Sequence, residues 1–163
     1  MPTPYSQYLN GRDPVDVMAE TIVKTRAALS RFKPEDFERS HAEGKWSARE
    51  VLIHLAHGEI VFGSRVRFAL TSDSYTVQPF DQDAWMALDA QGLDGQAALA
   101  LFSFSRAFNL GLFKRLTKEQ RAQTFTHPER GQIDIEDILV MTAGHELHHL
   151  AQLEEVARAI TQA

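Results

Sequence analysis

Four long stretches of the chain repeat apolar residues at the three-to-four-residue spacing of an α-helix. This spacing places the apolar side chains of each stretch on one helical face, which can pack against the others. No stretch makes a convincing strand. The sequence therefore predicts an all-α fold, a four-helix bundle. The expected helices cover about residues 13–32, 47–70, 95–116 and 135–160.

The start of the second helix has the clearest local signal. Ser47 followed by Glu50 fits a capping box, in which each side chain binds the backbone N–H of the other residue. Trp46 and Val51 bracket this pair and fit a hydrophobic staple. We expect further N-caps, which satisfy the free N–H groups of a first helical turn, at Asp13, Asp81, Thr117 and Asp134.

The segments between the long helices differ in length. Residues 33–46 are polar and should form a connection, which Pro34 begins by ending the first helix near Phe32. Residues 71–94 are long enough to cross the bundle, and 81–88 should form a short helix within them. Residues 126–133 should form a loop. We therefore expect one domain over 1–163, with a long crossover connection carrying a short extra helix.

Composition narrows the possible partners. The net charge is −5 and no run of Lys or Arg stands out, so we expect no nucleic-acid partner. The chain has no cysteine, which excludes disulfides, thiolate metal ligands and a cysteine nucleophile. No apolar stretch reaches membrane-spanning length, and the start of the sequence lacks the features of a signal peptide. We therefore expect a cytoplasmic protein without a membrane partner.

Histidines interrupt the apolar faces of two expected helices. His145 and His149 lie four residues apart in the last helix, so both rings can reach one metal ion from the same side. His148 is a competing second ligand. His54 borders the inward face of the second helix and is the best candidate for a third ligand. The alternative is that these rings are hydrogen-bonded core residues without a metal.

Other polar residues have simpler expected roles. His57, Glu59 and Glu146 should face solvent. The alternatives are that His57 is a further ligand or a base facing the pocket, and that either carboxylate orients a ligating ring. His127 should be a turn residue before Pro128, with a position over one end of the site as the alternative, and His41 lies in a polar loop without an assigned role. Core packing is expected for the apolar row of the third long helix, which includes Ala98, Leu101, Phe102, Phe108, Leu112 and Leu116.

Two motifs resemble the DinB/YfiT-like family of bacterial metal-binding helix bundles. They are Trp46-Ser47-x-x-Glu50-Val51-x-x-His54-Leu55 and His145-x-x-His148-His149-x-x-Gln152. The resemblance extends over nearly the whole chain in helix order and length. It implies a four-helix bundle whose metal ligands are His54, His145 and His149. It also implies zinc or nickel as the metal, a homodimer, and activities that include hydrolysis and the transfer of low-molecular-weight thiols.

Three protein ligands would leave one position of the metal open for water or substrate. The leading hypothesis is therefore a metal-dependent enzyme, either a hydrolase or a low-molecular-weight-thiol S-transferase acting on a small molecule. We assign no catalytic base, and we expect Trp85 or residues 71–80 to wall the pocket. One alternative is a non-catalytic metal-binding stress or interaction protein. The other is a plain helix bundle with core histidines.

Overall fold

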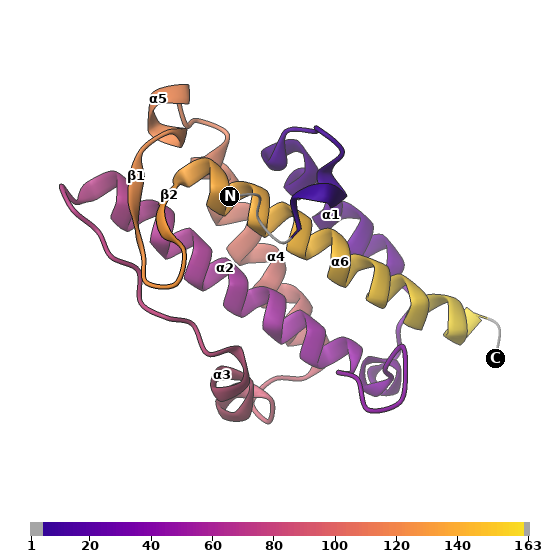
Figure 1. Ribbon diagram of the computed structural model, residues 1–163. Helices are drawn as coiled ribbons and strands as arrows, with labels where there is room; N and C mark the ends of the chain where they lie inside the picture. The colour runs from indigo at the N-terminus through magenta and orange to yellow at the C-terminus, as the bar shows by residue number, and fades with distance from the viewer. Residues whose placement is uncertain (1–4, 162–163) are drawn as a thin grey trace.

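In the computed structural model, which describes residues 5–161, four long helices lie side by side (Figure 1). Helix α1 packs on α4 and α6, and α2 packs on the same two helices, so the four surround a common core. This confirms the predicted four-helix bundle. Residues 1–4 and 162–163 of the expected single domain lie outside the described residues. The long helices are α1 (Pro14–Ala28), α2 (Ala48–Thr71), α4 (Gly95–Phe113) and α6 (Ile135–Thr161).

The helices begin where the capping signals predict. The Ser47 hydroxyl accepts a hydrogen bond from the Glu50 N–H at 3.2 Å, and the Glu50 carboxylate accepts one from the Ser47 N–H at 2.8 Å. Asp13 accepts hydrogen bonds from the N–H groups of Val15 and Asp16. The other predicted caps are also formed, by Asp81, Thr117 and Asp134. Local sequence therefore fixes where these five helices, α1, α2, α3, α5 and α6, start.

Short helices occupy the connections between the long ones. The crossover from α2 to α4 carries α3 (Gln82–Asp89), which confirms the predicted extra helix. The other short elements are the 3₁₀ helices η1 (Ser6–Leu9) and η2 (Pro34–Glu38), and the one-turn helix α5 (Lys118–Arg121). The expected end of the first helix near Phe32 is wrong, because α1 ends at Ala28. Ser30 there bonds Ala27 through both its N–H and its hydroxyl, which closes the chain into a turn.

A β-hairpin precedes α6, so the expectation of no strand and of a loop at 126–133 is wrong. Strands β1 (Thr124–His127) and β2 (Gly131–Asp134) pair antiparallel. The crossover is hydrogen-bonded to β1. The Thr126 N–H donates to Tyr75 O at 2.9 Å, and the Val77 N–H donates to Thr126 O at 3.0 Å. These strands are too short for their apolar alternation to be visible in the sequence. In Figure 1 the hairpin lies against α2 and the crossover.

Helix α4 presents to the core a face that differs in part from the one expected. Ala98 and Phe102 are buried as expected, but Phe108 is 71% exposed and Leu101 is 39% exposed, so only part of the predicted apolar row lies in the core. The buried face also carries Arg106 and Asn109, which the predicted row did not include. Arg106 and Asn109 bind a carboxylate on α2, and these polar contacts set the rotation of α4.

The core divides into two apolar clusters with buried polar groups between them. One cluster, around Val61 and Phe113, lies toward the hairpin end of the bundle, and the other surrounds Leu52 and Phe102. The buried polar side chains fall between these clusters along α1, α2, α4 and α6. Buried polar groups are stable only when hydrogen-bonded, paired or bound to a metal. The layer they form comprises Thr21, Thr25, His54, Glu59, Arg106, Asn109, Glu146 and His149.

Among residues 5–161, no helix has both the length and the apolar character needed to cross a membrane.

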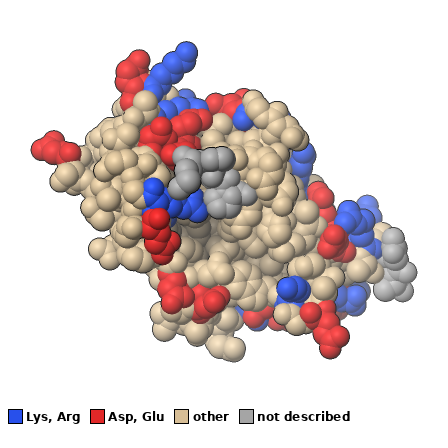
Figure 2. All heavy atoms as spheres, in the orientation of Figure 1, with Lys and Arg blue, Asp and Glu red and all other residues tan. Residues whose placement is uncertain are grey.

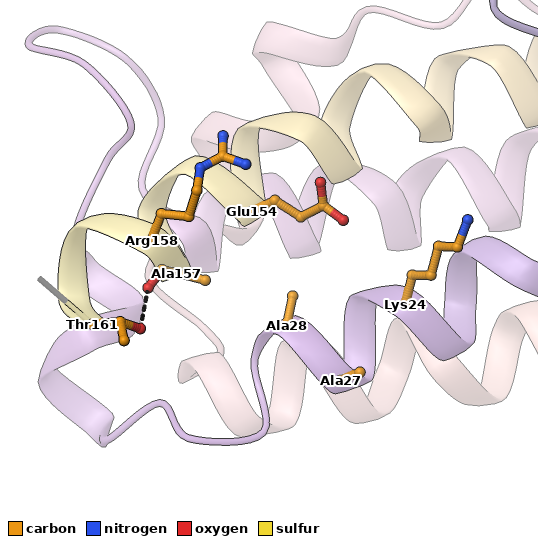
Figure 3. A pocket seen from close by; sticks show the side chains of 7 residues that line it. All are labelled: Lys24, Ala27, Ala28, Glu154, Ala157, Arg158 and Thr161. Carbon is orange, nitrogen blue, oxygen red and sulfur yellow. Dashed lines mark hydrogen bonds between the residues drawn. The ribbon is translucent and has the colours of Figure 1, made fainter.

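A shallow hollow lies between α1 and α6, away from the polar layer (Figure 3). Ala27, Ala28 and Ala157 contribute small side chains to its lining, and Lys24, Glu154 and Arg158 contribute charged ones. It brings no buried charged group toward a ligand.

Candidate metal centre

Three imidazoles from two helices converge within the polar layer. Nε2 of His54, on α2, lies 2.8 Å from Nε2 of His145, on α6. Nε2 of His149, one turn further along α6, lies 3.0 Å from the same His145 atom. The structure thus brings together all three predicted ligands, and their ligating nitrogens lie within 4.8 Å of one another.

Burial keeps these three rings neutral. Removal from water, followed by the proximity of the other imidazoles, lowers the pKa of His54 to about 3 and that of His145 to about 2. Burial also lowers the pKa of His149 to about 4. A neutral imidazole has a lone pair on one ring nitrogen, which is the form that binds metals. The three rings therefore offer lone pairs at neutral pH without first losing a proton.

Gln152 fixes the orientation of His149. The Gln152 side-chain carbonyl lies 2.8 Å from Nδ1 of His149 and accepts its proton, which leaves the lone pair on Nε2. The side-chain amide of Gln152 lies 3.4 Å from Nε2 of His148 and donates to it. His148 is therefore engaged outside the three-histidine group, and the geometry favours His149 over His148 as the second α6 ligand.

Aromatic side chains surround the group. The Trp46 ring lies 4.9 Å from the His54 ring, and the Tyr5 ring lies 5.5 Å from the His145 ring. Tyr5 can approach because residue 144 is glycine: a Cβ at Gly144 would lie 2.4 Å from the Tyr5 carbonyl oxygen. The ring centre of Trp85, one of the expected walls, lies 5.2 Å from that of His57.

A buried ion network lies next to the histidines. Arg106 pairs with Glu59 at 2.5 Å and with Glu146, and it donates to Met18 O at 3.2 Å. Burial, only partly offset by Arg106, raises the pKa of Glu146 to about 7. The expectation of solvent-facing Glu59 and Glu146 is therefore wrong. Both carboxylates pair with Arg106 rather than with a histidine ring.

Three further histidines have different positions. His57 is 3% exposed and its Nε2 lies 2.7 Å from the Asp89 carboxylate on α3, so its expected exposure is also wrong. His127 accepts a hydrogen bond from the Glu129 N–H at 3.3 Å, which agrees with its expected role in the turn. His41 lies close enough to His149 to lower the pKa of that ring.

The donor set fits a transition metal. Three nitrogen ligands suit zinc, nickel and similar ions. In addition, Nδ1 of His54 is buried and has no hydrogen-bond partner among the described residues. The ring is held by its packing against Trp46 and by the contact of its Nε2 with His145. Within residues 5–161, no fourth side chain joins the metal-ligand group, and a bound ion would keep an open position.

Comparisons with known proteins agree with this geometry. Residues 18–153 match the DinB superfamily. A protein of Oceanobacillus iheyensis, provisionally named a metal-dependent hydrolase, is 31% identical over 77% of this chain and 73% of its own. The structure of YfiT from Bacillus subtilis, described as a probable metal-dependent hydrolase with an unusual four-helix bundle topology, is 27% identical. It superimposes with a TM-score of 0.80 over 91% of this chain and 86% of that one. A mycothiol-dependent maleylpyruvate isomerase shares the fold, with 17% identity and a TM-score of 0.71 over 86% of this chain and 59% of that one.

Proposed function

This chain belongs to the DinB superfamily, and from that premise we propose that it is a metal-dependent enzyme with zinc or nickel at the three-histidine group. One observation carries the proposal: three buried, neutral imidazole nitrogens from α2 and α6 converge on one point. Such an arrangement would be costly to bury without a ligand that uses the lone pairs.

Each part of the group has a distinct task. His54, His145 and His149 would hold the ion, and Gln152 would keep the His149 ring turned toward it. The bound metal supplies Lewis-acid activation of a water or thiol at its open position. Trp46 and Tyr5 cover the rings and limit the access of bulk water. A dry surrounding strengthens the electrostatic interactions in the site.

Two reaction classes fit this arrangement: hydrolysis, and S-transfer of a low-molecular-weight thiol to a small-molecule acceptor. Hydrolysis is supported by the provisional names of the O. iheyensis and B. subtilis relatives. Thiol chemistry is supported by the mycothiol-dependent isomerase, which shares the fold. Both reactions would use the same open position, because a metal held by the three histidines would make a water or a thiol there more acidic.

The test is metal-dependent activity. The protein, loaded with zinc or with nickel, is assayed against ester and amide substrates and against thiol acceptors in the presence of mycothiol. We expect turnover of one class, lost in His149→Ala and retained in His148→Ala, the neighbouring control. A protein that binds metal but turns over neither class would support the alternative, a non-catalytic metal-binding protein.

We also propose a homodimer formed through α2 and α4. Ile60 and Phe68 on α2, with Phe104 and Phe108 on α4, are large apolar side chains exposed by 47% to 76%. Ile60 on α2 and Phe108 on α4 line the same surface depression, so the exposed apolar side chains of the two helices meet there. Contiguous apolar patches of this kind mark protein interfaces, and a patch on two neighbouring helices can pack on its own copy about a twofold axis. A cytoplasmic location remains the expectation from the sequence.

A further inference from the structure

A cleft of about 430 Å³ lies between α2, α6, the hairpin turn and the end of the crossover. Phe62, Phe80 and Met141 form apolar walls, and Arg65 and Arg130 reach it from α2 and the hairpin. Its volume is within the range of small-molecule pockets. Figure 2 shows a recess near the centre of this face, with basic and acidic atoms along its rim.

Arg65 is the unusual group in this cleft. It is 5% exposed, yet no carboxylate among the described residues forms an ion pair with it. The one side-chain hydrogen bond that it makes within residues 5–161 runs from Nη2 to the carbonyl oxygen of Gln78, at 2.9 Å. A buried charge is stable only when paired, and a guanidinium has five N–H donors in a planar fork. Arg65 therefore has donors that the protein does not use.

No other charged group among the described lining residues forms an ion pair with Arg65, although the charge of Glu129 acts on it from the hairpin turn. Asp81 caps α3 by accepting from the N–H groups of Asp83 and Ala84. Glu129 and Arg130 are exposed on the hairpin turn, where water screens both charges.

A neutral donor completes the polar end of the cleft. Burial, followed by the charges of Arg65 and Arg130, lowers the pKa of His127, so that ring is neutral. Nδ1 of His127 accepts a hydrogen bond from the backbone, which places its proton on Nε2 as a further donor.

The cleft adjoins the metal-ligand group. Phe62, one of its walls, lies with its ring 6.5 Å from the ring of His145. Met141, another wall, precedes His145 by one turn of α6. Arg65 follows His54 by eleven residues, close to three turns, which places both on nearly the same face of α2, roughly 16 Å apart along the axis. One small molecule can thus reach from Arg65 toward the histidines.

We propose that this cleft binds the carboxylate of an amphiphilic substrate, with Arg65 as its partner and Phe62, Phe80 and Met141 around its apolar body. A carboxylate matches the guanidinium in shape and accepts two parallel hydrogen bonds from it. A single negative charge also balances the buried guanidinium of Arg65. This rests on the proposed function, because it supplies the substrate class for the reaction at the histidines.

The experiment measures binding, independently of turnover. Isothermal titration calorimetry compares 4-phenylbutyrate with its uncharged amide, using the wild type, Arg65→Met and Arg65→Lys. Arg67→Met is the matched control, because Arg67 lies on the same helix but binds Asn109 and Gly63 O and stacks on Phe108. We expect the carboxylate to bind the wild type about tenfold or more tightly than the amide. Arg65→Met should remove this preference, Arg65→Lys should reduce it, and Arg67→Met should leave it unchanged.

Equal binding of the acid and the amide by the wild type would overturn the proposal, even if Arg65→Met failed to fold. Tighter binding of phenyl phosphate than of 4-phenylbutyrate would overturn the assignment to a carboxylate. The same titrations with His54→Ala separate this proposal from the metal proposal. If His54→Ala loses the metal but still prefers the acid, the proposal for the cleft is supported independently of the metal proposal. If the wild type binds metal but shows no preference for the acid, the proposal for the cleft is contradicted and the metal proposal is not.

Discussion

Gln152 accepts the Nδ1 proton of His149 at 2.8 Å, and this contact selects which nitrogen of the ring faces the other two histidines. Residues that hold a ligating ring from behind tune the affinity of a metal site. The geometry therefore extends the candidate metal centre one residue beyond its three ligands.

Replacing Gln152 should weaken metal binding without removing a ligand. In Gln152→Leu the His149 ring loses its acceptor, and we expect the zinc affinity to fall about 10- to 100-fold. Gln152→Glu keeps an acceptor and should retain most of the affinity. Competition with a chromogenic chelator measures both. Equal affinity in Gln152→Leu and the wild type would show that this contact does not orient the ring.

The ion network at Arg106 should matter for stability. Arg106→Met leaves Glu59 and Glu146 buried without their cation, which costs about 3–5 kcal/mol of the free energy of unfolding. Arg115→Met, at an exposed position shortly after α4, is the control and should change it by less than about 0.5 kcal/mol. Urea unfolding followed by circular dichroism gives both values. A small effect of Arg106→Met would mean that the carboxylates become protonated without loss of structure.

The cap of α1 should make stability depend on pH. Burial alone would raise the pKa of Asp13, but hydrogen bonds from Arg121 and the Val15 N–H outweigh it and lower the pKa below its ordinary value of 3.8. The unfolded chain then takes up this proton first as the pH falls, so the contribution of Asp13 is present above its unfolded pKa and is lost below it.

Asp13→Asn isolates this effect, because asparagine also caps helices but does not titrate. The wild type should be more stable than the variant near pH 6, by less than about 1 kcal/mol because the pair is partly exposed. That advantage should disappear between about pH 5 and about pH 3. Urea unfolding at a series of pH values measures it. An advantage that grows on acidification would contradict the sign.

The proposed dimer surface predicts a change of mass. Phe104 is 76% exposed on α4, and a charge there should be unfavourable inside an apolar interface. Phe104→Glu should shift the protein toward the monomer in light scattering. Val23→Glu, 66% exposed on α1, is the matched control and should leave the mass unchanged. A wild-type protein that is monomeric at high concentration would contradict the proposed dimer interface on α2 and α4.

The features that sequence reasoning predicted are mostly local ones. The capping box of Ser47 and Glu50 depends on residues three apart, so the start of α2 could be placed from the sequence. The spacing of His145 and His149 likewise lies within one helix. Their meeting with His54 was a hypothesis strengthened by family resemblance, since no local pattern joins residues 91 positions apart.

The errors share a different cause, a partner far away in the sequence. Glu59 looks like a surface residue until Arg106, 47 positions later, is placed beside it. His57 is buried because Asp89 arrives on the crossover helix to pair with it. The rotation of α4 follows from the same buried contacts. A polar residue on an apolar face was the available signal in each case, and it indicates burial only when its partner is known.

Metal content tests the central claim most directly. Purified wild type, His54→Ala, and the controls His57→Ala and His148→Ala are each loaded with zinc or nickel, dialysed and measured by elemental analysis, with circular dichroism to confirm folding. We predict near-stoichiometric metal in the wild type and both controls, and its loss in folded His54→Ala. Full metal retention by His54→Ala, or no metal in any sample, would contradict a site built from His54, His145 and His149.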